Sequence, residues 1–449
     1  MKKYMNSLIK RKISALALVM AMAVSVLAGC GESKTTSVST NQSESETATL
    51  SETQGASATT VAETTTAYKK TTIDIMMIGD ILEHEGVYNS GKMDDGTYNY
   101  DHLFAQITSE AQAADISIVN QETILGGVEL GLSGYPCFNS AQETGDAEVK
   151  AGFNVILHAT NHTLDKGLTG VTNTLNYWKE SHPEVTYLGI NASEEEYNSI
   201  YVYEKDGFKV AILNYTYGTN GIPVPDSAPY CVNLLDSEHE EKVVSDIQRA
   251  KTMADMVVVC PHWGTEYTYT PTDEQAYWTN IFLTNGVDLV LGTHPHVLEP
   301  VETLTDETTG HQMVVYYSLG NFVSNQDFIP RMLGGMAKVT LVKENDKCYI
   351  EKYSLVPLVT HKLFGQGLIT TYKLSDYTEA LASQNRIGID SNVCFSADAW
   401  YSCKCGAYEL GLSTHGSVNF SKDYLNQLSA VILGEQYNTE TMELTVTLH

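Results

Sequence analysis

Residues 287–296 read Val-Asp-Leu-Val-Leu-Gly-Thr-His-Pro-His. The run Val287–Leu291 is apolar apart from its aspartate, and a glycine ends it, which is typical of a buried strand that leads into a loop. Two imidazoles, His294 and His296, follow on that loop, two residues apart. The stretch therefore predicts a buried strand that delivers metal-type ligands at its carboxyl end.

Five other apolar runs end in polar motifs in the same way. Ligands bind where the strands of a helix-covered sheet end and loops begin, so we expect the six motifs to meet in one polar pocket. Carboxylate, amide and imidazole groups together suit a divalent metal. The other runs and their motifs are Ile73–Ile78 with Gly79-Asp80, Asp115–Val119 with Asn120-Gln121-Glu122, Phe153–Leu157 with Thr160-Asn161-His162-Thr163-Leu164-Asp165, Met256–Cys260 with Pro261-His262-Trp263-Gly264, and Val314–Leu319 with Gly320-Asn321-Phe322.

Helical patterns lie between several of these strands, which favours an α/β fold with much parallel pairing. Four more runs predict additional strands without long helices between the later ones, and so a second, partly antiparallel sheet packed on the first. The helical segments are Asp101–Ala114, Asp165–Glu180, Asp236–Ala254 and Thr272–Asn285; the additional strands are Phe208–Tyr215, Met313–Leu319, Met336–Val342 and Tyr349–Val359. Beyond about Leu363 the pattern weakens, and it indicates one helix over Ser375–Asn385 and one strand over Met442–Leu448.

Residues 1–30 have the pattern of a bacterial lipoprotein signal peptide. Five basic residues precede the apolar stretch Ile13–Val26, and Leu27-Ala28-Gly29 places small residues before Cys30, the predicted lipidation site. An uncleaved membrane anchor is the alternative, although the stretch is short of the about 20 residues that a spanning helix needs. Either alternative places the folded part on the extracytoplasmic face of a bacterial cell membrane. Residues 31–70, rich in Ser and Thr, predict a disordered tether.

The charge balance excludes one class of partner. The chain has 27 basic and 55 acidic side chains, a formal charge of −28, and loss of the five basic residues of the leader brings it near −33. Nucleic-acid binding requires clustered Lys and Arg, so we expect no nucleic acid as a partner. A polyanionic substrate would need a metal or a local cation to offset repulsion.

Eight cysteines are present, and without Cys30 the other seven cannot all pair within one chain. Cys260 lies in an apolar strand and is expected to be a buried free thiol. The late cluster of Cys394, Cys403 and Cys405 forms either one disulfide or none, and both alternatives stay open. A zinc site there is disfavoured because no fourth ligand has a familiar spacing.

The mixture of Asp, Glu, Asn and His in the six motifs fits two divalent transition-metal ions that share a carboxylate. Imidazole and carboxylate ligands favour Mn, Fe or Zn, whereas a Ca or Mg site would be nearly all oxygen. Two neighbouring ions can stabilise both the attacking and the leaving oxygen of a hydrolysis.

With all six motifs in order, residues from Thr71 to about Val359 resemble the CapA family, which is linked to poly-γ-glutamate capsule synthesis within the calcineurin-like metallophosphoesterase superfamily. The resemblance implies a metallophosphatase-like sandwich of two mixed β-sheets flanked by helices over residues 71–360. A smaller C-terminal extension, of a fold that the sequence leaves open, covers residues 361–449.

The resemblance also implies roles for individual residues. It gives the first metal Asp80 and His296, the bridging position Glu122, the second metal Asn161, His262 and His294, and the proton donor His162. The superfamily usually has a histidine two residues after the first aspartate, where this chain has Leu82, and His84 is the nearest replacement.

The roles of several polar residues around these motifs are predicted less specifically. Substrate contacts are predicted for Thr293, where family members often carry His, and for Glu266, Tyr267 and Asn321. Asp165 is expected to cap a helix that begins at Lys166. Glu83 and Glu85 are interpreted as part of a polar loop.

Two functions follow as alternatives. The first is a metal-dependent hydrolase acting on a phosphoester, or on an amide bond of a cell-surface polymer, in capsule or poly-γ-glutamate synthesis or export. The second is a non-catalytic accessory subunit of the capsule export machinery that binds the polymer. In both, the expected partner is an anionic cell-surface polymer or its synthesis and export complex.

Overall fold

A computed structural model describes residues 69–363, 367–385, 410 and 420–449. The predicted signal peptide with Cys30, most of the predicted tether and the Cys394, Cys403 and Cys405 cluster lie outside the described residues. No helix in the described part is long and apolar enough to cross a membrane.

The first of two sheets is built around β1 (Lys70–Ile81), which carries the first polar motif at its end. It pairs in parallel with β2 on one side and antiparallel with β12 on the other, so this ten-stranded sheet is mixed. Its order is β15-β16-β13-β12-β1-β2-β3-β4, with β11 on β1 and β14 on β13. The remaining strands are β2 (Ile116–Gln121), β3 (Val155–Leu157), β4 (Thr186–Leu188), β11 (Asn321–Val323), β12 (Leu333–Glu344), β13 (Lys347–Lys362), β14 (Ile369–Lys373), β15 (Tyr437–Asn438) and β16 (Glu443–Thr447).

The second sheet has six strands in the order β5-β6-β7-β8-β10-β9. Its inner strands β6, β7, β8 and β10 run parallel, while β5 and β9 pair antiparallel at the edges. The strands are β5 (Tyr201–Lys205), β6 (Phe208–Thr216), β7 (Met256–His262), β8 (Leu289–Leu291), β9 (Val301–Thr305) and β10 (Gln312–Tyr316).

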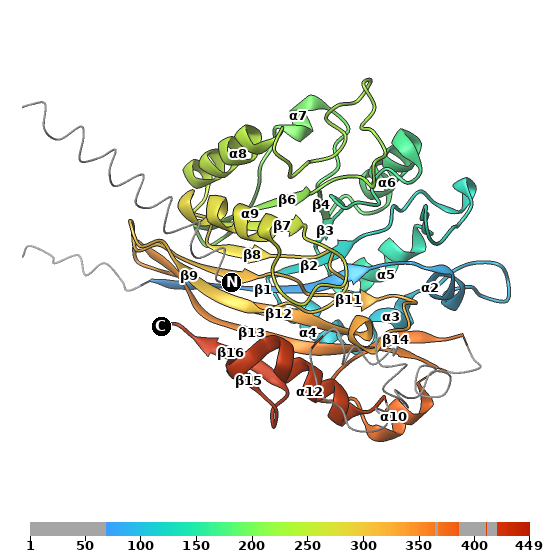
Figure 1. Cartoon of the computed structure of the whole chain (residues 1–449). Helices are drawn as coiled ribbons and strands as arrows, with labels where there is room; N and C mark the ends of the chain where they lie inside the picture. The colour runs from blue at the N-terminus through green and yellow to red at the C-terminus, as the bar shows by residue number, and fades with distance from the viewer. Residues whose placement is uncertain (1–68, 364–366, 386–409, 411–419) are drawn as a thin grey trace, which may run out of the picture. The chain divides into compact units, whose positions relative to one another are not determined.

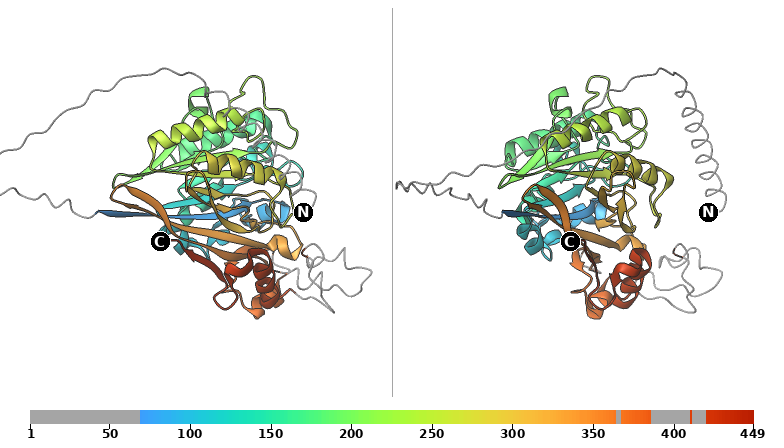
Figure 2. Two further views of the ribbon diagram at one scale, coloured as in Figure 1. Left: turned by 60° about the vertical axis from the view of Figure 1, so that its left-hand side comes forward. Right: turned by 90° about the vertical axis from the view of Figure 1, so that its left-hand side faces the viewer.

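The two sheets pack face to face, and helices cover their outer faces (Figure 1). Both faces of β1 are buried, because successive side chains of a strand point to opposite faces of the sheet. Ile73, Ile75 and Met77 join the core between the sheets, whereas Met76 and Ile78 pack under helices on the other side. Helices α8 and α9 bury apolar residues against the six-stranded sheet, and Figure 2 shows the same order of layers from two other directions. This α/β sandwich of two mixed sheets is the predicted fold class.

The helices that make the outer layers are short to medium in length. They are α2 (Glu85–Ser90), α3 (Asp101–Phe104), α4 (Thr108–Ala113), α5 (Glu143–Ala151), α6 (Gly167–Ser181), α7 (Glu194–Tyr197), α8 (Glu240–Met253), α9 (Asp273–Thr284), α10 (Glu379–Gln384) and α12 (Lys422–Leu433), with 3₁₀ turns η1 (Val128–Leu130), η2 (Ile329–Met332) and η4 (Gly434–Gln436). The predicted helix over Asp101–Ala114 is therefore two short helices, α3 and α4.

One part of the sheet prediction was wrong. Met336–Val342 and Tyr349–Val359 were expected in the second sheet, but they form β12 and β13, which belong to the same sheet as β1. The second sheet instead contains β7 and β8, which end at His262 and just before the Gly-Thr-His-Pro-His motif. The six motifs are thus divided between two sheets.

The C-terminal residues continue the first sheet. Strands β14 and β16 both pair with β13, and Leu425 and Leu428 of α12 are buried in the same apolar cluster as residues of β13. Cys260 is buried and free, as predicted, and burial raises the pKa of its thiol.

Candidate metal centre

The six polar motifs meet where strands of both sheets end. Asp80 at the end of β1 is level with Asn120 of β2, and Glu122 follows one residue after that strand. From the other sheet, His262 ends β7 and forms a bridge with Thr293, which follows β8. Residues far apart in the sequence are thereby brought together, as the motif pattern predicted.

The first ligand group consists of Asp80, Glu122 and His296. One candidate ligand atom from each lies within 4.8 Å of the others, and all three residues are buried. His296 Nδ1 is 3.2 Å from Asp80 Oδ2, and its Nε2 is 3.7 Å from Glu122 Oε1. These are the residues to which the resemblance gave the first metal and the bridging position.

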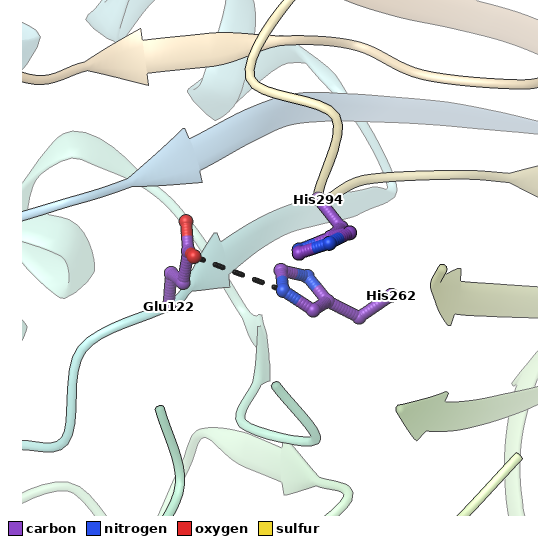
Figure 3. A group of neighbouring side chains, drawn as sticks. All are labelled: Glu122, His262 and His294. Carbon is purple, nitrogen blue, oxygen red and sulfur yellow. Dashed lines mark ion pairs between the residues drawn. The ribbon is translucent and has the colours of Figure 1, made fainter. Parts of the chain in front are cut away.

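The second group consists of Glu122, His262 and His294, again buried and within 4.8 Å (Figure 3). His262 Nε2 is 3.7 Å from Glu122 Oε1, and the rings of His262 and His294 are 4.8 Å apart. Asn161 lies beside this group, with its Oδ1 3.0 Å from His262 Nε2. Glu122 is therefore common to both groups.

Unpartnered buried atoms show that these residues fit metal ions. Both carboxylate oxygens of Glu122 and the Nδ1 atom of His294 are buried without a hydrogen-bond partner. Leaving such groups unpaired costs about 1–3 kcal/mol each, and more for a charged group. Bound cations would satisfy them, and the mixed nitrogen and oxygen donors suit a transition metal.

The electrostatics of the site agree with that fit. Burial, together with the charge of Asp80, raises the pKa of Glu122 well above its usual range. Burial lowers the pKa of His262 and His294, so both are neutral imidazoles, which is the form that binds metal. Burial also acts to lower the pKa of His296, but Glu122 and Asp80 outweigh it and raise the pKa to about 9. The two carboxylates thus attract positive charge.

Neighbouring polar groups hold the imidazoles in place. Thr293 Oγ1 lies 3.0 Å from His262 Nδ1, and Asn321 Oδ1 lies 3.0 Å from His296 Nδ1. In each case the Nε2 atom of the ring is left facing Glu122. Both Thr293 and Asn321 are buried, and Asn321 also donates to Gln326 Oε1 and to the Arg331 carbonyl; the substrate contacts predicted for Thr293 and Asn321 stay predictions.

Backbone strain sets the direction of two ligands. His294 has φ of 100° and His296 has φ of 59°, a region that non-glycine residues rarely adopt and that costs on the order of 1–3 kcal/mol. Gly79, before Asp80, is required for another reason: a Cβ atom there would lie 1.9 Å from Gly320 O. The ends of β1 and β11 can therefore approach closely only with glycine at this position.

His162 lies at the edge of the centre, with its Nε2 4.0 Å from Glu122 Oε1. Its Nδ1 is 2.7 Å from Asp165 Oδ2, and that oxygen also accepts the N–H of Phe138 at 2.6 Å. The predicted N-cap role of Asp165 is wrong, because α6 begins at Gly167 and its N-cap residue, Lys166, caps it with no side-chain hydrogen bond. The three-residue spacing of His162 and Asp165 was the available signal for this pair.

The rim of the site includes residues that sequence reasoning missed. The predicted substrate contact Tyr267 has its hydroxyl 3.2 Å from Gln326 Nε2, and the Arg331 guanidinium stacks 3.5 Å from the centre of its ring. Glu266 is exposed, and its charge raises the pKa of Tyr267, as burial does. Arg331 gives an otherwise acidic protein a cation beside Tyr267, and its position after Pro330 gave no sequence signal.

Neither Leu82 nor His84 adds a ligand. Leu82 is buried and apolar, and His84 belongs to neither ligand group of the described residues. The His84 ring packs edge-on against Phe138, and burial lowers its pKa to about 4. The first group therefore has three side-chain ligand candidates.

A two-sheet α/β fold whose strand ends bring together two ligand groups sharing one carboxylate defines a candidate dinuclear metal centre. The family model described as bacterial capsule synthesis protein PGA_cap matches residues 74–326, more than half of the chain, and the chain belongs to this family. The CapA resemblance is thereby confirmed.

Two curated relatives carry corresponding names. The PGA biosynthesis protein CapA of Bacillus subtilis is 33% identical over 175 residues, which is 39% of this chain and 43% of that protein. The capsule biosynthesis protein CapA of Bacillus anthracis is 30% identical over 189 residues, 42% of this chain and 44% of that protein. The match thus spans less than half of the length of each relative.

Among solved structures, the NAD nucleotidase NadN of Haemophilus influenzae is similar with a TM-score of 0.41 and 12% identity, over 65% of this chain and 56% of that one. A similarity of this size carries no information on activity.

The geometry predicts that His294→Ala combined with His296→Ala will lower the metal content of the purified full chain by about half or more. The melting temperature should fall as well, because a metal that binds only the folded state stabilises it. Elemental analysis and thermal unfolding measure both effects. The matched control removes two surface imidazoles, His182 and His239, each of which pairs with an aspartate. Equal metal content in the two double variants would contradict the assignment.

Proposed function

We propose that this protein is a metal-dependent hydrolase that cleaves a phosphoester bond, or an amide bond of a capsule polymer, at the centre around Glu122. The observation that carries the proposal is the position of Glu122 between two buried ligand groups, with neither of its oxygens hydrogen-bonded. A purely structural carboxylate buried to this extent would be hydrogen-bonded.

The residues that would hold the ions are the members of the two groups, with Asn161 as a further oxygen donor. When bound, two divalent ions would supply polarisation of the scissile bond and activation of water. The protein itself contributes orientation, because Thr293 and Asn321 fix the rings of His262 and His296.

His162 is the proton donor in this proposal. The Asp165 carboxylate accepts a hydrogen bond from Nδ1 of His162, which leaves Nε2 as the atom that faces the centre. In this role Nε2 would pass a proton to a leaving oxygen or nitrogen, while the hydrogen bond to Asp165 keeps the ring oriented toward the centre. A positioned proton donor contributes about 10²–10⁴-fold to rate.

The substrate is proposed to be an anionic polymer of the cell surface, or a precursor of it. Support comes from the family and from the names of the two relatives, which refer to capsule and PGA biosynthesis. At the rim, the Arg331 guanidinium is positioned to offset part of the negative charge that such a substrate shares with the protein.

One observation favours the non-catalytic alternative. Leu82 contributes no ligand, so the Asp80 group has three side-chain candidates, and a weakly held first ion would reduce turnover. In this alternative the protein is an accessory subunit that binds an anionic polymer for the export machinery.

His162→Ala is expected to cut turnover by about 10²–10⁴-fold and to leave metal content nearly unchanged, because the ring lies outside both ligand groups. Asp165→Asn should also lower turnover, by a smaller factor than His162→Ala. Activity is measured on phosphodiester and γ-glutamyl substrates. The control is His239→Ala, which removes a surface imidazole that pairs with Asp236 at the same three-residue spacing.

Loss of metal from His162→Ala would show that His162 is a ligand and that the division of roles is wrong. The accessory alternative predicts a different pattern: no turnover by the wild type on any of these substrates, with polymer binding retained by His162→Ala and by His262→Ala.

We further propose that the chain is anchored to the extracytoplasmic face of the bacterial membrane through a lipid on Cys30. Support comes from Leu27-Ala28-Gly29 directly before Cys30 and from the family's role in capsule synthesis, a cell-envelope process.

For this anchor, Cys30→Ala should move most of the protein from the membrane fraction to the soluble fraction of cells. The matched control is Cys137→Ala, which removes an exposed thiol from the folded part. Equal membrane retention of Cys30→Ala and wild type would support an uncleaved helix instead.

A further inference from the structure

A second buried acidic cluster lies beside the candidate metal centre and belongs to neither ligand group. Glu83, two residues after β1, and Glu148 of α5 are both fully buried. Burial raises the pKa of Glu148, and the charge of Glu83 adds to the rise. Glu83 lies in the loop between β1 and α2, as interpreted, but the residue is buried in the interior.

Two uncharged residues complete the cluster. Thr144 and Glu148 are four residues apart on α5 and so face the same side of that helix. Burial raises the pKa of Glu83 to about 7, while the Thr144 and Ser140 hydroxyls and the Gln121 amide, which lie near Glu83, oppose the rise. A hydrogen bond holds the Gln121 side chain in place, because its Nε2 donates to the Thr123 carbonyl at 2.7 Å.

The cluster contains six unpartnered oxygen atoms. They are both carboxylate oxygens of Glu83, both of Glu148, Oε1 of Gln121 and Oγ1 of Thr144, and all four side chains are fully buried. In the part of the chain that the structure describes, no Lys, Arg or His forms an ion pair with Glu83 or Glu148. The other titratable groups that sense them, Glu143, Tyr100 and Tyr177, supply no positive charge.

Two neighbouring carboxylates cannot both be ionised in the interior without compensation, because burying an isolated charge costs several kcal/mol or more. We propose that Glu83, Glu148, Gln121 and Thr144 bind a calcium ion. All of the donors are oxygen, and six donor atoms match the 6–8 oxygen ligands of Ca²⁺. Mg²⁺ fits less well, since it demands near-ideal octahedral geometry and usually keeps several of its waters.

The position of the site gives the ion a structural consequence. Glu83 follows the strand that carries Asp80, and Gln121 immediately precedes Glu122. A calcium ion here would fasten α5 to the ends of β1 and β2, and would thereby hold the two strands that deliver carboxylates to the candidate metal centre. This inference does not depend on whether that centre catalyses a reaction.

The test uses the full chain, stripped with chelator and reloaded with Mn²⁺ so that the candidate metal centre is occupied before calcium is added. At pH 8, 1 mM CaCl₂ should raise the melting temperature by about 2–4 °C, because the ion binds only the folded state. Glu148→Gln should abolish this shift without changing Mn²⁺ content. The matched control, Glu143→Gln on the same helix, should keep it. An equal or larger response to Mg²⁺ would contradict the choice of calcium.

A shared proton is the competing explanation, and pH separates the two. A carboxyl group whose folded-state pKa is raised contributes stability that is complete below its unfolded-state pKa and is lost as the pH rises toward the folded-state value, about 7 for Glu83. Chelated wild type should therefore gain stability over Glu83→Gln between pH 8 and pH 5, while the calcium response fades over the same range. If calcium has no effect at pH 8 and this pH effect is present, protons alone hold the cluster and the proposal is overturned.

Discussion

The structure depends on the burial of two carboxylates, Asp80 and Glu122, at a point where two sheets end together. Neither is exposed, and in the interior their negative charge must be met by imidazoles, amide donors or cations. Asn120 donates to Asp80 Oδ1 at 2.8 Å, and His296 is 3.2 Å from Asp80 Oδ2. Glu122 has no comparable partner, and this asymmetry makes it the natural position for a shared ligand.

The surrounding fold supplies the rigidity that this arrangement needs. His294 and His296 adopt strained backbone conformations, which persist only where the surrounding structure over-determines them. Here the core between the sheets and the close contact of Gly79 with Gly320 fix the loop geometry. Proton transfer is assigned to a different kind of residue, because His162 is held by Asp165 rather than by a ligand group. In the proposed mechanism, ligation and acid–base chemistry thus rest on separate side chains.

Much of the centre could be predicted because each ligand candidate follows an apolar run, and that pattern is local in sequence. What could not be predicted depends on distant contacts. The partition of strands between sheets was missed because β12 joins β1 across more than 250 residues. Asp165 was assigned to the nearest helix because its second partner, the N–H of Phe138, is 27 residues away. The burial of the loop residue Glu83 was missed because its neighbour Thr144 lies on α5, far along the chain.

The central claim is that one carboxylate, Glu122, serves two metal sites. The most direct measurement is the metal content of Glu122→Ala, determined by elemental analysis beside wild type and beside Glu266→Ala, which removes an exposed carboxylate at the rim. A shared ligand predicts that Glu122→Ala loses both ions, whereas Glu266→Ala keeps them. Retention of both ions by Glu122→Ala, or loss of a single ion with the other bound as tightly as before, would contradict the account.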